Sequence, residues 1–106
     1  MSSNAIPSQA SLLKAKVKLP SHVVYRTFPS ETVVLNLQTG KYHGLNPTAG
    51  RMLETLERAE SVLDAATTAA GEYEQSQATT ERDMCGLCSS LLERDLIEIE
   101  QGDGGA

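Results

Sequence analysis

The residues of this sequence best suited to redox, nucleophilic or metal chemistry are two cysteines and two histidines. Cys85 and Cys88 have the spacing of a thioredoxin-like redox pair, which works when a strand leads into the helix that the pair opens. No such strand precedes Cys85, so we expect reduced, buried thiols that act as small apolar side chains. A zinc site would need His22 and His43 as further ligands, and their spacing is irregular. We therefore expect no metal.

No other group of residues predicts catalysis. The sequence lacks a nucleophile with a base and an orienting group, a glycine-rich phosphate loop, and a carboxylate pair in an evident cleft. We accordingly expect a protein that is not an enzyme and that has no cofactor.

Composition restricts the partners. The chain has 106 residues, 40% of them hydrophobic, and 9 Lys+Arg against 14 Asp+Glu give a net charge of −5. This length predicts one domain, and no stretch approaches the roughly 20 apolar residues of a membrane span. The N-terminus has neither the basic start nor the apolar run of a secretory signal, so the expected location is the cytoplasm. The acidic balance also argues against nucleic acid as a partner.

The residues that could position a site begin with a strand pattern. Residues 23–28 are β-branched and aromatic, and residues 29–31 have the composition of a turn. Residues 32–37 alternate so that Val33, Leu35 and Leu37 share one face. Gly40 supplies the positive φ of a short hairpin, and residues 41–45 then form a third strand antiparallel to the second.

After residue 45 the sequence pattern changes to that of helices. Asn46 and Pro47 are a favourable helix start, Ser61 with Asp64 opens a second helix, and Thr80 with Asp83 opens a third that runs to about Arg94. A short extended segment follows at residues 96–99. Residues 1–18 and 101–106 are expected to be mobile tails around a domain at residues 19–100. Because strands and helices are segregated along the chain, the predicted fold class is α+β with a small antiparallel sheet packed on three helices.

The ordered set of motifs resembles the PqqD-like family, whose members recognise precursor peptides that are made ribosomally and then modified. The resemblance covers roughly residues 20–99 and rests on three segments: residues 34–46, residues 49–53 with Glu72 and Tyr73, and residues 83–97. Two positions depart from the family pattern. Leu53 stands where many members have Trp, and Asp95 stands where many have a helix-ending Gly.

The resemblance implies a winged helix-turn-helix whose third strand is a free edge beside the third helix. It further implies that the chain binds the leader segment of a precursor peptide and presents it to a leader peptidase, a cyclase or a radical-SAM maturase. A discrete single domain favours the lasso-peptide type. The protein itself is expected to be a monomer or a weak dimer.

An extended peptide can add to a free strand edge through its backbone, and side-chain pockets then give specificity. On the third strand we assign the peptide contacts to Lys41, Tyr42, His43 and Leu45. On the third helix, the flank beside the core direction suggests a shallow groove that is lined by Cys85, Ser89 and Leu92, with Gly86 permitting close approach. Asp83 is a further candidate, although capping of the helix start is the simpler role. Proline at His43 is expected to remove an edge amide.

Two other functions stay open at this point. A winged helix-turn-helix is a common DNA-binding fold, but the third helix carries Glu81, Asp83, Glu93 and Asp95 against only two arginines, which would repel phosphates. A structural subunit is the other alternative, in which the same edge strand pairs with a second copy.

Overall fold

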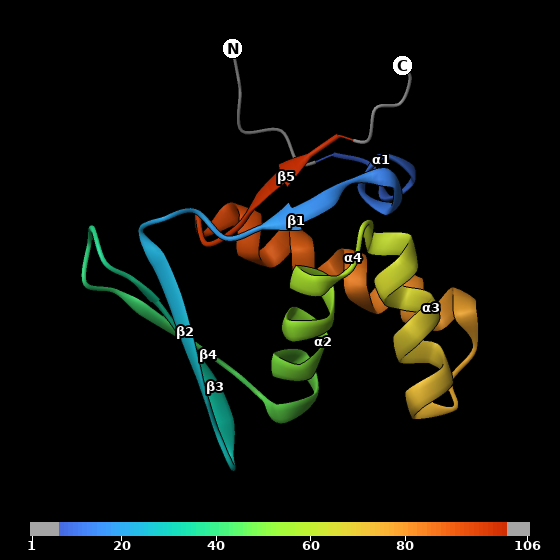
Figure 1. Ribbon diagram of the computed structural model, residues 1–106, viewed down its shortest axis with the longest axis horizontal. Helices are drawn as coiled ribbons and strands as arrows, with labels where there is room; N and C mark the ends of the chain where they lie inside the picture. The colour runs from blue at the N-terminus through green and yellow to red at the C-terminus, as the bar shows by residue number, and fades with distance from the viewer. Residues whose placement is uncertain (1–6, 102–106) are drawn as a thin grey trace.

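The computed structural model describes residues 7–101, in which the chain forms four helices and five strands (Figure 1). In chain order they are α1 Gln9–Lys14, β1 Lys16–Lys18, β2 Val23–Phe28, β3 Glu31–Asn36, β4 Tyr42–Leu45, α2 Pro47–Arg58, α3 Val62–Tyr73, α4 Gln77–Glu93 and β5 Glu98–Glu100.

Strands β2, β3 and β4 form an antiparallel sheet in that order, as the sequence pattern predicted. Val24 lies opposite Leu35, and Leu35 lies opposite Tyr42. Gly40 has a φ of 77° in the hairpin between β3 and β4, which confirms the expected left-handed position. The sheet stands at one end of the molecule, with α2 between it and α3 (Figure 1).

The two faces of the sheet differ in burial. Thr32, Val34 and Asn36 of β3 are buried and face the helices. Val33, Leu35 and Leu37 share the opposite face, as predicted, and that face is the more exposed one, with the Leu37 side chain 56% exposed. The sheet therefore contributes a single face to the core, as small antiparallel sheets commonly do.

Helices α2 and α3 begin at the predicted residues. The Asn46 side chain accepts a hydrogen bond from the Ala49 amide at 2.8 Å, and Pro47 is the first helical residue. The Ser61 hydroxyl accepts one from the Asp64 amide at 3.0 Å. These caps satisfy amides that the first turn leaves free. Leu53, one of the two departures from the family pattern, is fully buried in the core.

Helix α4 begins one turn earlier than predicted. Ser76, not Thr80, is its N-cap, and its hydroxyl accepts a hydrogen bond from the Thr79 amide at 3.1 Å. Thr80 is fully buried, and its own hydroxyl is directed at Gln75 Oε1 and the Ser76 carbonyl. The capping role expected for Asp83 is therefore wrong. A Ser and a Thr four residues apart offer the same local signal, and burial decides between them.

The prediction of a mobile tail over residues 1–18 is wrong for residues 9–18. Helix α1 buries Leu12, and β1 buries Val17 and pairs antiparallel with β5, so that the two ends of the domain meet (Figure 1). A six-residue helix has too few turns for its period to be read, and its stability comes from tertiary packing. Residues 1–6 and 102–106 of the expected tails lie outside the described residues.

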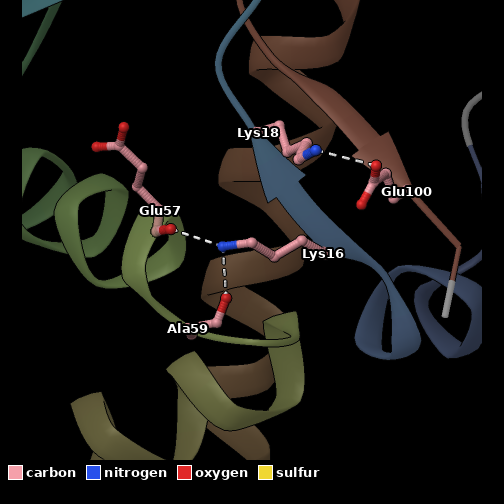
Figure 2. Close-up of polar contacts among 5 residues, drawn as sticks. All are labelled: Lys16, Lys18, Glu57, Ala59 and Glu100. Atoms are coloured by element: carbon pink, nitrogen blue, oxygen red, sulfur yellow. Dashed lines mark hydrogen bonds and ion pairs between the residues drawn. The ribbon is translucent and has the colours of Figure 1, made fainter.

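Lys16 fixes this N-terminal segment to α2. Its ammonium group donates to the Glu57 and Ala59 carbonyls at 2.6 and 2.7 Å, at the C-terminal end of α2 (Figure 2). A cation there satisfies free carbonyls and opposes the negative end of the helix dipole. Lys18, two residues on, forms a more exposed ion pair with Glu100 of β5 at 3.0 Å (Figure 2).

The fold class is α+β, with a three-stranded antiparallel sheet as expected, and with a fourth helix and a second, two-stranded sheet that the sequence pattern did not predict. A single core runs from Leu12 to Ile97, so the domain begins before residue 19. Within residues 7–101, no helix combines the length and the apolarity needed to cross a membrane.

Candidate functional site

The edge of the sheet at β4 has no strand partner other than β3 in the described part of the chain. The Asn36 amide donates to the Lys41 carbonyl at 2.9 Å, and this bond fixes the alternation along the antiparallel ladder. His43 and Leu45, two and four residues on, are hydrogen-bonded to β3. Tyr42 and Gly44 therefore direct their N–H and C=O groups away from β3, toward the free edge.

The hairpin holds this edge in place. The buried Asn36 side chain accepts hydrogen bonds from the Gln38 and Thr39 amides at 2.8 and 3.2 Å. The Gly40 amide donates to the Asn36 carbonyl at 2.8 Å, and the left-handed Gly40 closes the turn. As a result, one buried amide side chain and one glycine set where β4 starts.

The C-terminal end of α4 approaches β4 from the other side. Arg94 Nε donates a hydrogen bond to His43 Nδ1 at 3.2 Å, across 51 positions of sequence. Between the hairpin and the helix end lies a hollow of about 410 Å³. It is lined by Asn36, Thr39, Lys41, Tyr42, His43, Arg94, Asp95 and Leu96.

Asp95 ends α4 in the left-handed conformation, with a φ of 60°. This is the position at which family members often carry Gly, and a non-glycine residue is strained there, although Asp tolerates it better than most. The Asp95 carboxylate lies 3.7 Å from His22 Nε2, which brings the loop before β2 to the same end of the helix. The helix end thus lies between two histidines, His22 and His43.

His43 accepts the Arg94 hydrogen bond as a neutral imidazole. Burial first, and the nearby guanidinium second, lower the pKa of His43 below its ordinary value. The ring is therefore an acceptor at neutral pH, and it contributes no positive charge to the hollow.

The residues predicted on the third strand separate into two groups. Lys41, Tyr42 and His43 line the hollow, and the Tyr42 side chain is 74% exposed. Leu45 is buried in the core and does not line it. Tyr42 also borders an apolar surface on the outer face of the sheet, which includes Val24, Phe28, Val33 and Leu35.

Three of the residues predicted on the third helix, Cys85, Ser89 and Leu92, lie on the flank away from Arg94. Cys85 is buried, and its Sγ lies 4.0 Å from the Gln9 carbonyl of α1, the helix that the sequence analysis took for a mobile tail. Ser89 and Leu92 are half-buried on the same flank, at one and two turns from Cys85. Since α1 covers Cys85, this thiol does not line an open groove.

The opposite flank of α4 lies on the same side of the helix as Arg94. Counting back by helical turns from Arg94 gives Ser90, Leu87 and Asp83, at spacings of four, seven and eleven residues. Ser90 and Leu87 are half-buried and Asp83 is exposed. Gly86 is exposed with open space around its Cα, so a methyl group would fit there. Sequence reasoning named Asp83 as a candidate and missed the rest of this stripe, because both flanks carry small residues and α1 comes from a distant segment.

The two thiols are free and buried, as expected. Burial, with a smaller contribution from Glu81, raises the pKa of Cys85, and burial raises the pKa of Cys88 to about 12. Both thiols are therefore protonated at neutral pH, which is the opposite of an activated redox pair. Within residues 7–101 no three His, Cys, Asp or Glu side chains gather as a ligand set for a metal ion.

Two solved structures have a similar architecture. The solved structure "Lasso peptide synthetase B1 complexed with the leader peptide" has a TM-score of 0.71 and 28% identity, and the match covers 78% of this chain and 98% of that one. "TbiB1 in Complex with the TbiA(beta) Leader Peptide" has a TM-score of 0.69 and 29% identity, over 84% of this chain and 98% of that one. No curated protein matches.

The family model for coenzyme PQQ synthesis protein D (PqqD) matches residues 31–97. This range runs from the start of β3 to the segment after α4, and it includes both the edge strand and the helix that border the hollow. Because the match extends over more than half of the sequence, the chain belongs to the PqqD family.

Proposed function

We propose that this chain binds the leader segment of a ribosomally synthesised precursor peptide as an added strand on β4. The observation that carries the proposal is the free β4 edge, where Tyr42 and Gly44 direct backbone groups into open space beside α4. An extended peptide satisfies those groups, and β4 then becomes an inner strand.

An added strand alternates its side chains between the two faces of the sheet. Side chains on the outer face would pack beside Tyr42 and the apolar surface that it borders. Side chains on the inner face would enter the space between β4 and the α4 stripe of Asp83, Leu87, Ser90 and Arg94. The eleven steps along the chain from Asp83 to Arg94 rise about 16 Å along the helix, which matches about five residues of extended peptide.

The comparisons support leader binding. Two solved relatives at 28% and 29% identity are named as complexes with leader peptides, and each aligns over 98% of its own length. In this proposal the chain is a non-catalytic partner that presents the bound precursor to a leader peptidase, a cyclase or a radical-SAM maturase. The name of the first relative, a lasso peptide synthetase B1, favours a lasso-peptide pathway.

The charge of α4 disfavours a DNA-binding role. Its exposed or half-buried charges are Glu81, Arg82, Asp83, Glu93 and the capping Arg94, followed by Asp95, so acids outnumber bases by four to two. A recognition helix of this composition would repel phosphates. Dimerisation through β4 uses the same edge as the leader, and the two would therefore compete.

A titration tests the proposal. Isotope-labelled protein is titrated with a synthetic peptide for the leader segment of the precursor encoded beside its own gene, and amide chemical shifts are followed. We expect saturable shifts at Tyr42, Gly44 and the α4 stripe, with small changes at Cys85 and in α1. A scrambled peptide of the same composition is the control. Shifts confined to α1 or absent everywhere would contradict the proposed site, and sedimentation of the same sample reports on a β4 dimer.

A further inference from the structure

Two cations in the hollow have no carboxylate partner. Lys41 and Arg94 both line it, whereas the basic and acidic side chains that approach within 4.0 Å of each other among residues 7–101 are Lys18 with Glu100 and His22 with Asp95. The hollow therefore brings two unpaired cations together in a chain whose net charge is −5.

The acid in this hollow does not neutralise Arg94. Asp95 directs Oδ2 toward His22 Nε2 at 3.7 Å, and its side chain is 78% exposed. The Arg94 side chain is instead hydrogen-bonded through Nε to the neutral ring of His43. A guanidinium has five N–H donors, and a carboxylate can accept two of them side by side. Arg94 therefore makes a weaker contact here than it would make with an acid.

The geometry of strand addition places a peptide side chain at this point. Lys41 and His43 lie on the inner face of β4, the face toward which Arg94 extends. Tyr42 and Gly44 would make the backbone hydrogen bonds to an antiparallel added strand, so the peptide residue opposite His43 is in a non-hydrogen-bonded pair, where side chains come closest. Lys41 is its diagonal neighbour on the same face.

We infer that this hollow selects leaders with an aspartate or glutamate opposite His43, held by Arg94 and Lys41. The inference rests on the proposed function and specifies the chemistry of its ligand. When the acid is bound, Arg94 turns from His43 to the carboxylate. Backbone pairing alone accepts any extended peptide, whereas this pair of cations distinguishes peptides by one charged side chain.

A double-mutant cycle tests the inference. The probe is the synthetic leader of the neighbouring precursor gene, together with single replacements of each Asp by Asn and each Glu by Gln. Binding is measured for the wild-type chain, for Arg94→Gln, and for Arg82→Gln as the matched control, because Arg82 is exposed on α4 and does not line the hollow. Calorimetry gives Kd, and circular dichroism checks that each variant is folded.

We expect one acid whose replacement weakens binding to the wild-type chain about tenfold, the size of a charge-assisted hydrogen bond that is partly open to solvent. The same replacement should change Kd less than twofold in Arg94→Gln and should keep its full effect in Arg82→Gln. A reversed pair, Arg94→Glu with lysine at that leader position, should recover part of the lost affinity.

The outcomes separate the two proposals. If the wild-type chain binds the leader but no acid replacement matters, or if its effect is the same in Arg94→Gln, the acidic selection is overturned and leader binding stands. If the wild-type chain does not bind the leader at all, both are overturned.

Discussion

Replacing Tyr42 by proline removes one backbone N–H from the free edge of β4 and leaves the pairing of β4 with β3 in place. Proline is tolerated at the first residue of an edge strand, which is the position of Tyr42. The side chain is 74% exposed, so its loss opens no cavity in the core. The matched control is Tyr42→Ala, which loses the same ring and keeps the amide.

The expected loss follows from one hydrogen bond. A hydrogen bond from this edge to the backbone of the leader contributes about 1 kcal/mol net to binding, because both groups are hydrated in the free molecules. That corresponds to about a fivefold rise in Kd for Tyr42→Pro over Tyr42→Ala. His43→Pro, which the sequence analysis favoured, is not this test. The His43 amide points to β3, so that variant should lose stability, in addition to any effect on binding.

Fluorescence anisotropy with a labelled leader peptide gives Kd for each variant, and thermal unfolding by circular dichroism reports on the fold. If Tyr42→Pro remains folded and binds within twofold of Tyr42→Ala, the backbone of Tyr42 does not pair with the leader. Gly44→Pro, compared with Gly44→Ala, repeats the test at the other outward-facing residue.

Three further predictions concern stability and thiol chemistry, the first two measured by urea unfolding. Lys16→Met, which keeps the aliphatic stem and loses two hydrogen bonds to α2 carbonyls, should cost about 1–2 kcal/mol, whereas Lys18→Met, which breaks an exposed ion pair, should cost about 0.5 kcal/mol or less; equal losses would contradict the capping role. Gly50→Ala should destabilise the fold by about 1–3 kcal/mol because a Cβ there collides with a buried threonine, while Gly71→Ala, with open space around it, should stabilise α3 by about 0.5–1 kcal/mol. Cys88, with a pKa of about 12, should react with iodoacetamide at pH 8 at least a hundredfold more slowly in the folded chain than in urea, and rapid labelling of the native protein would refute its burial.

Local signals in the sequence predicted the sheet and the first two long helices. Asn46 and Ser61 cap their helices through short side chains that reach an amide three residues on, and Gly40 allows a turn that other residues disfavour. These are interactions between neighbours in the chain, so their outcome depends little on the rest of the fold. The start of α4 was misplaced because Ser76 and Thr80 are both acceptable caps, and burial of Thr80 in the core excludes it.

Local patterns also predicted the strand side of the candidate site, but not its helix side. That β4 would be an edge strand, with Lys41, Tyr42 and His43 beside an open space, followed from the strand pattern and the family resemblance. The choice of helix flank did not, because the two sides of α4 have similar composition. Helix α1 covers one of these flanks by packing over Cys85, and α1 comes from a segment more than 70 positions away in sequence.

The sequence by itself determined the fold class, the antiparallel hairpins, the caps of α2 and α3, and the membership of the family. Those features depend on periodicity and on contacts between residues a few positions apart, both of which can be recognised in the sequence. Only the tertiary structure decided that residues 9–18 belong to the domain, that Tyr42 and Gly44 face outward, and that Arg94 meets His43. Each of these depends on which distant surfaces pack together, and the free energy of that packing is not a property of any local segment.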